Sequence, residues 1–190
     1  FITGAPQGAF KYKNRTEGAA SSAGKFASTF ALGSQILRPF YPEYADNLIP
    51  KALAAYEFGR QKPGFTQTAP CRAPYFYEEE NYVDDMELAA TQLEQVFPGQ
   101  QYAKQAAEYG RTEPVTPWMG SDTARHYQWY PFVNLGHYFQ AEIRDDPNAV
   151  QFLEFMRRGV DSVYRRGKNN PFLYGVPFIW CSNNLNVAIG

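Results

Sequence analysis

The chain has 190 residues, of which 17% are aromatic and 19% are charged, and its net charge is −1. This length is enough for one domain with a hydrophobic core. A near-neutral chain lacks the basic field on which nucleic-acid binding depends, and no apolar run approaches the roughly eighteen residues that a membrane-spanning helix needs. The composition therefore predicts a globular domain that binds neither nucleic acid nor membrane.

Six helices are expected from the spacing of apolar residues and from proline and glycine stop signals. The fourth is expected to end at Gly110 and the second at Gly59, since glycine commonly follows the last helical residue. Pro50 lies inside the second and predicts a kink or a late start. No stretch alternates well enough to predict a strand. The expected helices are Ser21–Leu37, Pro42–Phe58, Val83–Val96, Gln100–Tyr109, Asp122–Ile143 and Pro147–Arg166.

The two ends of the sequence suggest a piece of a larger domain. The first residue is not methionine, and the last stretch, CSNNLNVAIG, has the pattern of a helix that has just begun, with Asn183 or Asn184 as its cap. A helix of about two turns is marginal alone. We therefore expect residues 1–190 to form a single but incomplete domain.

The lengths of the connections predict how the helices are arranged. Short joins of about four residues follow the first, third and fifth helices, whereas long joins span roughly 60–82, 111–121 and 167–182. Short joins make αα-hairpins, and stacked hairpins place their long loops at one end, where function commonly resides. This alternation predicts three hairpins and the start of a fourth, as in an α-solenoid or a helical toroid.

The long connections also hold unusual residues. All three tryptophans, Trp118, Trp129 and Trp180, lie in or just after them, and aromatic rings can serve as platforms for a flat ligand such as a sugar ring. On the fifth helix, Asp122, His126 and Trp129 would share one face near its beginning. A kinked core helix would give the same stripe, so a core role and a binding role both stay open.

Metal-ligand patterns are weak. Cys71 and Cys181 have no C-x-x-C partner, and His126 and His137 are too far apart in sequence for the i, i+4 spacing of a zinc helix. One disulfide between the two cysteines is possible and not required. No cofactor is expected, although a structural calcium site within Glu78–Asp85 is an open alternative.

Six carboxylates lie between Glu78 and Glu87. Paired carboxylates are the catalysts of glycoside hydrolysis. Acidic groups before a helix and in its first turn also interact favourably with the helix dipole, each by about 0.3–1 kcal/mol. We interpret most of this run as the start of the third helix. A hydrolase that uses Glu79, Glu80 or Asp84 is the alternative.

Several segments together resemble glycoside hydrolase family 9, the inverting cellulases and endoglucanases. The stretch FIWCSNNLNVAIG resembles the family's W-G-S-N segment and the Asn- and Ala-rich helix after it. NYVDDMELAATQLEQV resembles its Trp/Tyr-x-Asp-Asp/Glu helix, and SSAGKFASTFALGSQILRPFYPEYADNLIPKALAAYEF resembles the hairpin before that helix. CRAPYFYEEENYVDDMELA and TPWMGSDTARHYQWYPFVNLGHY look like a bacterial branch. The order and spacing agree over nearly the whole chain.

The resemblance implies an all-α fold in which antiparallel αα-hairpins form part of an (α/α)₆ barrel, with the cleft at the N-terminal ends of the inner helices. The chain would be the middle of that catalytic barrel. The family's base, in a D-A-G-D motif, its acid, in an N-E motif, and its H-H-R substrate motif are all absent here. The resemblance therefore implies no catalytic residue in this chain.

Binding roles are the ones that the resemblance and the positions suggest. Trp180 matches the W-G-S-N tryptophan that stacks on sugar, and Asn183 matches its asparagine, while Cys181 replaces the usual glycine. The predicted substrate-binding residues are Trp118, Asp122, His126, Trp129, Tyr130, Trp180 and Asn183.

The implied parent enzyme hydrolyses β-1,4-glucan or a related β-glucan, outside the cell or in the periplasm. Its partners would be a β-glucan polysaccharide or oligosaccharide, and the exposed edges of this chain would meet the rest of its own barrel or other chains. The alternative is a helical-toroid domain with a non-catalytic carbohydrate-binding or structural role.

Overall fold

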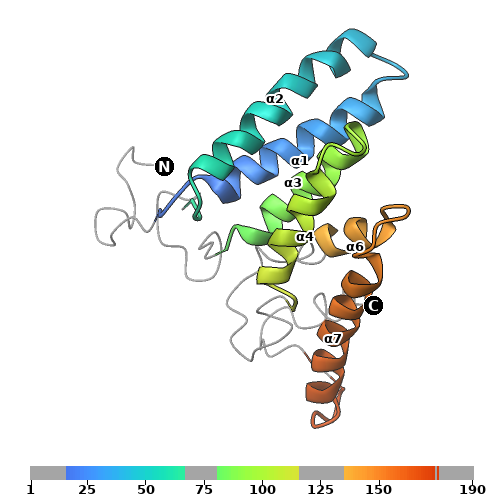
Figure 1. The fold of residues 1–190 in the computed structure, drawn as a ribbon. Helices are drawn as coiled ribbons and strands as arrows, with labels where there is room; N and C mark the ends of the chain where they lie inside the picture. The colour runs from blue at the N-terminus through green and yellow to red at the C-terminus, as the bar shows by residue number, and fades with distance from the viewer. Residues whose placement is uncertain (1–15, 67–80, 116–134, 174, 176–190) are drawn as a thin grey trace.

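The computed structural model describes residues 16–66, 81–115, 135–173 and 175, and all regular structure in these ranges is helical. No strand occurs in them, and no helix there is long and apolar enough to cross a membrane. The prediction of an all-α chain is confirmed. The helices are α1 (Ala20–Leu37), α2 (Pro42–Gln61), α3 (Val83–Val96), α4 (Tyr102–Thr112), α6 (Leu135–Glu142) and α7 (Ala149–Gly167), as labelled in Figure 1.

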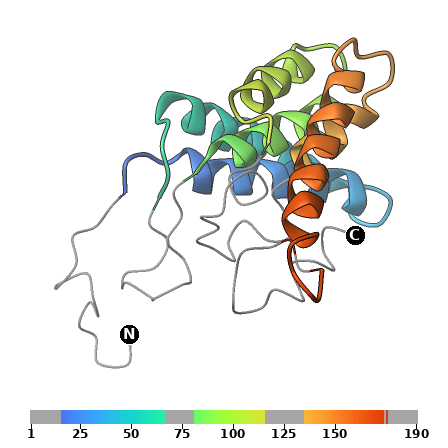
Figure 2. The ribbon, with the colours of Figure 1, turned by 90° about the horizontal axis from the view of Figure 1, so that it is seen from below.

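Consecutive helices pack as pairs. Short turns over 38–41, 97–101 and 143–148 join α1 to α2, α3 to α4 and α6 to α7, and the members of each pair contact each other. All three turns lie on the same side of the molecule (Figure 1). Helix α3 contacts α1, α2, α4 and α6, and the view from below shows it between α1 and α4 (Figure 2). It is the centre of the described structure.

The ends of the long connections lie opposite these turns. The carbonyl of Phe65, after α2, accepts hydrogen bonds from the backbone N–H groups of Glu17 and Gly18, before α1, at 3.0 and 3.2 Å. The Thr66 N–H donates to Ser21 Oγ at 2.9 Å. The end of α2 is thus fixed to the start of α1, as the loop lengths predict.

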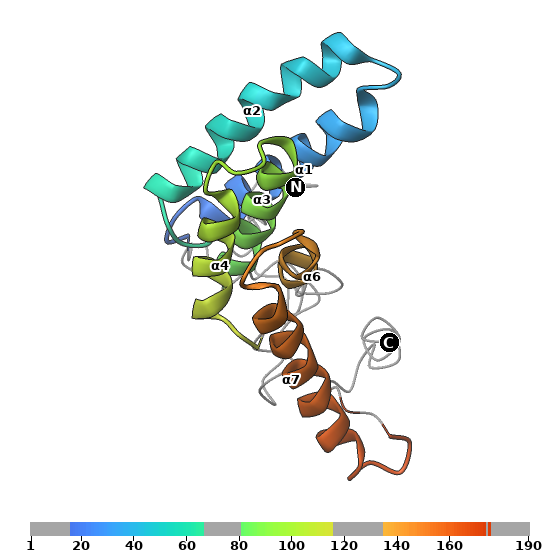
Figure 3. The ribbon, with the colours of Figure 1, turned by 45° about the vertical axis from the view of Figure 1, so that its right-hand side comes forward.

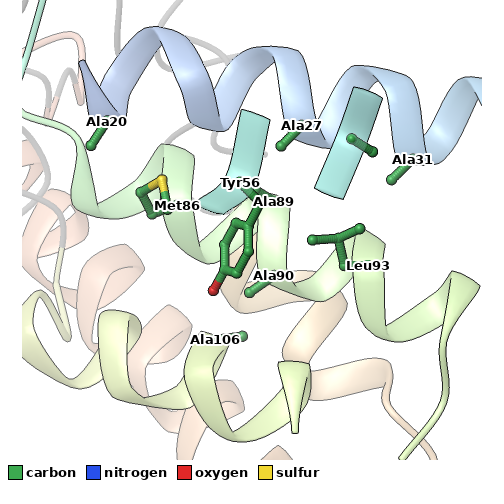
Figure 4. Close-up of a cluster of buried hydrophobic side chains, with 10 residues drawn as sticks. Ala20, Ala27, Ala31, Tyr56, Met86, Ala89, Ala90, Leu93 and Ala106 are labelled. Carbon is green, nitrogen blue, oxygen red and sulfur yellow. The ribbon is translucent and has the colours of Figure 1, made fainter. Parts of the chain in front are cut away.

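The core between α1 and α3 is built from small residues. Ala20, Ala27 and Ala31 of α1 and Ala89 of α3 belong to one cluster of buried residues, in which Ala90 of α3 lies toward Ala106 of α4 (Figure 4). Small side chains let two helix backbones approach closely, and the larger side chains of the same cluster fill the remaining space at normal packing density. These larger side chains are Tyr56, Met86 and Leu93.

Two expected helix ends are wrong. Helix α2 continues past Gly59 to Gln61, and α4 continues past Gly110 to Thr112. A Cβ on Gly59 would lie 2.7 Å from Met86 Sδ, and one on Gly110 would lie 2.7 Å from Cζ of Phe152. Both glycines therefore serve close contact between helices and do not end one.

The other boundaries agree with the prediction within a few residues, apart from two differences. Helix α4 begins at Tyr102, after the expected Gln100, because Gln101 adopts a left-handed conformation with φ of 71°. Of the expected fifth helix, only the part that forms α6 falls in the described ranges, and Asp122 at its expected start lies outside them.

Large apolar side chains are exposed at the two extremes of the described structure. Figure 3 shows the α1–α2 hairpin and α7 pointing away from the centre in opposite directions. Such exposure fits elements that have neighbours on one side only. The most exposed are Phe26, Ile36, Phe40 and Tyr41 near the first hairpin and Val150, Tyr164, Phe172 and Leu173 on and after α7.

Candidate functional site

The predicted sugar-binding residues all lie outside the described residues. Two stretches hold them, 116–134 and 176–190. The structure does describe the residues on either side of the first stretch, from α4 to Pro114 and from Leu135 into α6. The residues outside the description are Trp118, Asp122, His126, Trp129, Tyr130, Trp180 and Asn183.

Where α3 meets the first turn of α6, Glu87 and His137 form a buried ionisable pair. Each residue is only 2% exposed, and Glu87 Oε1 lies 2.7 Å from His137 Nδ1. A buried carboxylate or imidazolium is strongly disfavoured unless it is paired and hydrogen-bonded. The two residues are fifty positions apart in sequence, so only the fold brings them together.

Two glycines make room for the carboxylate. A Cβ on Gly110 of α4 would lie 2.8 Å from Glu87 Oε1, and a Cβ on Gly136 of α6 would lie 2.8 Å from Glu87 Cδ. Both contacts are closer than a real side chain could make without moving Glu87. The carboxylate is therefore held between two helices that carry glycine where they face it.

The imidazole has an aromatic wall from α7. The His137 ring meets Phe152 edge-on, with ring centroids 5.1 Å apart, and meets Phe155 at 5.7 Å. Phe152 is fully buried. These rings exclude water from the pair and fix the plane of the imidazole, so both ring nitrogens have a defined direction.

The second ring nitrogen of His137 faces the end of α4. Nε2 lies 3.2 Å from the carbonyl oxygen of Pro114. Because a carbonyl oxygen can only accept, Nε2 must carry the hydrogen. The remaining proton lies between Nδ1 and Glu87 Oε1, whichever of the two holds it. The pair is therefore neutral as a unit, which makes its burial tolerable.

The environment affects both pKa values. Burial alone would lower the pKa of His137, but the hydrogen bond and negative charge of Glu87 and the Pro114 carbonyl together raise it. Burial raises the pKa of Glu87, against the lowering effect of its hydrogen bond to His137. Both shifts favour keeping the proton that joins the two groups.

A second carboxyl group lies next to the pair. Glu113, just after α4, accepts a hydrogen bond from Asn81 Nδ2 at 2.6 Å. Asn81 Oδ1 in turn accepts from the backbone N–H groups of Tyr82 and Val83, at the start of α3. Burial, opposed by the Asn81 hydrogen bond and assisted by nearby negative charge, raises the pKa of Glu113 to about 7.

We call Asn81, Glu87, Glu113, Pro114 and His137 the anchor cluster. It joins the first half of α3, the end of α4 and the start of α6, where two of the long connections meet the helices. The cluster can hold a proton and fix backbone positions. Glu87 and His137 do not suit direct catalysis on a polysaccharide, because their side chains are buried and a catalyst must reach its substrate.

The rest of the acidic run behaves as a helix start. Asp84 and Asp85 lie in the first turn of α3, as expected for groups that interact with the helix dipole. Asp85 also pairs with Lys25 of α1 at 3.1 Å. No group of three or more His, Cys, Asp or Glu in the described part of the chain could hold a metal ion, and Glu78–Glu80 lie outside it.

Sequence reasoning missed the roles of Glu87 and His137. In the sequence Glu87 belongs to the acidic run, and His137 lies too far from His126 for a zinc helix. One signal was available: Glu87 has the helical spacing of Ala90 and Glu94, which places it on a face that a central helix buries. Nothing in the sequence paired it with His137.

Comparison with known families now adds an independent finding. The model of glycosyl hydrolase family 9 matches residues 2–188. The chain belongs to glycosyl hydrolase family 9. A search of curated proteins gave no match. Membership of family 9 confirms the resemblance stated for the separate segments and identifies a glycoside hydrolase with a carbohydrate substrate. The paired helices are accordingly part of an (α/α)₆ barrel.

Proposed function

We propose that this chain is the middle part of the catalytic barrel of an enzyme that hydrolyses β-1,4-glucan with inversion of configuration. The observation that carries the proposal is the family match over residues 2–188 in a sequence that contains neither D-A-G-D nor N-E. The chain then supplies cleft wall and sugar-binding residues, and the acid and base come from other parts of a longer protein.

Inversion needs two carboxyl groups about 6.5–9.5 Å apart with a water molecule between them. Two carboxyl groups of α3 do not suit that role, because Glu87 is buried against His137 and Asp85 is paired with Lys25. A role in binding the substrate suits this chain better than a role in catalysis. This supports a binding role beside catalytic groups that lie elsewhere.

The proposed contacts to sugar come from the two long stretches outside the described residues. Tryptophan and tyrosine rings stack on the C–H faces of glucose units, and aspartate, histidine and asparagine side chains bond the hydroxyls. The residues proposed for these contacts are Trp118, Asp122, His126, Trp129, Tyr130, Trp180 and Asn183.

The proposed enzyme needs no cofactor, and it works outside the cell or in the periplasm, where polymeric glucan occurs. The exposed apolar side chains of the α1–α2 hairpin and α7 are proposed to meet the rest of the same barrel. Burying them would stabilise the barrel, since about 25 cal/mol is gained per Å² of apolar surface removed from water.

The test compares the chain alone with the longer protein encoded by its gene, on carboxymethylcellulose and cellohexaose. We expect the longer protein to release the α-anomer first in ¹H NMR and the chain alone to release no reducing sugar. Release by the chain alone that is lost in Glu79→Gln or Asp84→Asn would place catalysis in this chain. A longer protein that binds cellohexaose without cleaving it would favour the non-catalytic toroid.

A further inference from the structure

Segment 115–134 leaves the helices after Pro114 and rejoins them at Leu135, so its two ends are Pro114 and the first turn of α6. His137 lies in that first turn. Its Nε2 donates a hydrogen bond to the Pro114 carbonyl, 23 positions earlier in the sequence. One side chain at the end of the segment therefore bonds the backbone at its beginning.

We propose that His137 is a positioning residue whose imidazole ties the carbonyl of Pro114 to the start of α6 and so fixes both ends of segment 115–134 relative to α3. Loop closure is entropically unfavourable, and a bond between the two ends restricts the positions that the segment can take. The segment needs defined ends if its side chains are to meet a ligand in one geometry.

Glu87 determines whether His137 can make this bond. A neutral imidazole carries one hydrogen, and a group that accepted a hydrogen from Nδ1 would leave Nε2 without one. Glu87 shares a proton with Nδ1, so Nε2 keeps its hydrogen for Pro114. Gly110 and Gly136 hold the carboxylate in place. The arrangement resembles the outer carboxylate that orients a histidine in many sites.

The same cluster holds the neighbouring connection. Asn81 is the first described residue after 67–80, and its side chain bonds Glu113, the residue before Pro114. Two long connections are thus fixed at adjacent residues just after α4. Because segment 115–134 carries five of the proposed sugar-binding residues, the importance of His137 for binding rests on the proposed function, whereas its effect on the segment's ends does not.

Two substitutions separate the two hydrogen bonds of His137. In His137→Asn the amide nitrogen takes the place of Nδ1, so it can reach Glu87 but not Pro114. In His137→Gln the longer side chain places its amide nitrogen near the position of Nε2, so it can still donate to Pro114. Both variants lose the aromatic packing on Phe152, so both lose stability. Only the Asn variant should release the end of the segment.

A matched control lies on the same helix. Glu94 is also a buried carboxylate of α3, but its oxygens accept from the N–H groups of Gly99 and Ala103 at 2.7 and 2.9 Å, at the short-turn end. Glu94→Gln should weaken the α3–α4 hairpin without releasing segment 115–134.

The measurement is native-state trypsin cleavage after Arg125, the one lysine or arginine of the segment, relative to cleavage after Lys51 inside α2, which requires α2 to unfold. When opening is fast, cleavage follows the population of open states. We expect the ratio to rise about fivefold to tenfold in His137→Asn, as loss of one such hydrogen bond allows, and to rise less than about twofold in His137→Gln and Glu94→Gln.

A double variant covers the case in which His137→Asn does not fold. Glu87→Met with His137→Phe replaces both partners by apolar side chains of similar shape, a change that is often neutral for stability. It should keep the helical circular dichroism and still raise the Arg125 ratio. Equal ratios for the Asn and Gln variants, or a double variant with the wild-type ratio, would overturn the proposal.

Calorimetric titration with cellohexaose separates this proposal from the proposed function. If the wild-type chain binds, His137→Asn should weaken the affinity about fivefold or more and His137→Gln should weaken it less. If no variant and no wild-type chain binds cellohexaose, while the Arg125 ratios behave as expected, the role of His137 stands and a sugar-binding role for the segment in the isolated chain is rejected.

Discussion

The two ends of α3 use the same residue type differently. Glu94 accepts two backbone N–H groups and closes the short turn between α3 and α4, so all its contacts lie within one hairpin. Glu87, two turns earlier, pairs with a histidine fifty residues away and joins three helices. Burial alone does not reveal what a carboxylate does. A carboxylate whose partners are near in sequence stabilises one hairpin, whereas one whose partner is far away in sequence holds separate helices together.

The largest expected effect is the loss of one member of the buried pair. Glu87→Ala leaves His137 without its partner and opens a cavity between Gly110 and Gly136, and breaking a buried pair commonly costs about 3–5 kcal/mol. Glu94→Ala should cost less, about 1–3 kcal/mol, because it loses hydrogen bonds to neutral groups. Urea unfolding followed by circular dichroism measures both. Equal losses would remove the contrast between the two ends.

Next in size is the glycine that faces Glu87. In an exposed helix interior, Gly→Ala stabilises by roughly 0.5–1 kcal/mol. Gly110→Ala should instead destabilise by about 2–3 kcal/mol, because the new methyl group would overlap Phe152 and the Glu87 carboxylate.

Gly33→Ala in α1 is the control for this prediction. Its new Cβ would meet only the end of the Leu48 side chain, at 3.3 Å, and that side chain can move. The Gly33 variant should be as stable as the wild type or slightly more stable in the same urea titration. A Gly110 variant that is also more stable would show that α4 does not press on Glu87.

These glycines show how far sequence reasoning reaches. Apolar spacing and connection length were enough to predict the paired helices, since both depend on local chemistry. The glycine signal is also local, so it predicts helix ends at Gly59 and Gly110, although each of them faces another helix. The contact between Glu87 and His137 depends on tertiary packing, and no periodicity encodes it. None of the predicted sugar-binding residues lies in the described ranges, and their roles remain predictions.

The third prediction concerns pH. Glu113 has a pKa of about 7 in the folded chain, above the ordinary value of about 4.3 in unfolded chains. The folded state therefore binds this proton more tightly, so its stabilising contribution is full below about pH 4 and is lost as pH rises to 7. The ionisable groups that act on it are Asp84, Glu87 and His137.

Glu113→Gln should flatten the decline in unfolding free energy between pH 5 and 8. At pH 8 the variant should exceed the wild type by about 1–2 kcal/mol, below the limit of roughly 3.5 kcal/mol that the full shift would give. The raised pKa of His137 leaves a further decline above about pH 6.5 in both proteins. Glu108→Gln, at an exposed site on α4 shortly before Glu113, controls for the loss of one charge. Parallel profiles for wild type and Glu113→Gln would contradict the assignment.

The smallest expected effect comes from Gln92, which lies between the two carboxylates on α3. Its side chain is 1% exposed, and neither its amide nitrogen nor its amide oxygen has a hydrogen-bond partner among the described residues. An unpaired buried amide destabilises the folded state, because it loses its hydrogen bonds to water and gains none. Gln92→Met keeps the length and flexibility of the side chain and removes both polar groups, so it should stabilise the chain by about 0.5–1 kcal/mol in urea unfolding. Gln105→Met is the control, because Gln105 Oε1 accepts the Tyr56 hydroxyl at 2.8 Å and the same substitution there should destabilise. If Gln92→Met destabilises as much as Gln105→Met, then the Gln92 amide is hydrogen-bonded in the folded protein. The middle of α3 would then contribute a stabilising polar contact, as Glu87 and Glu94 do toward its two ends.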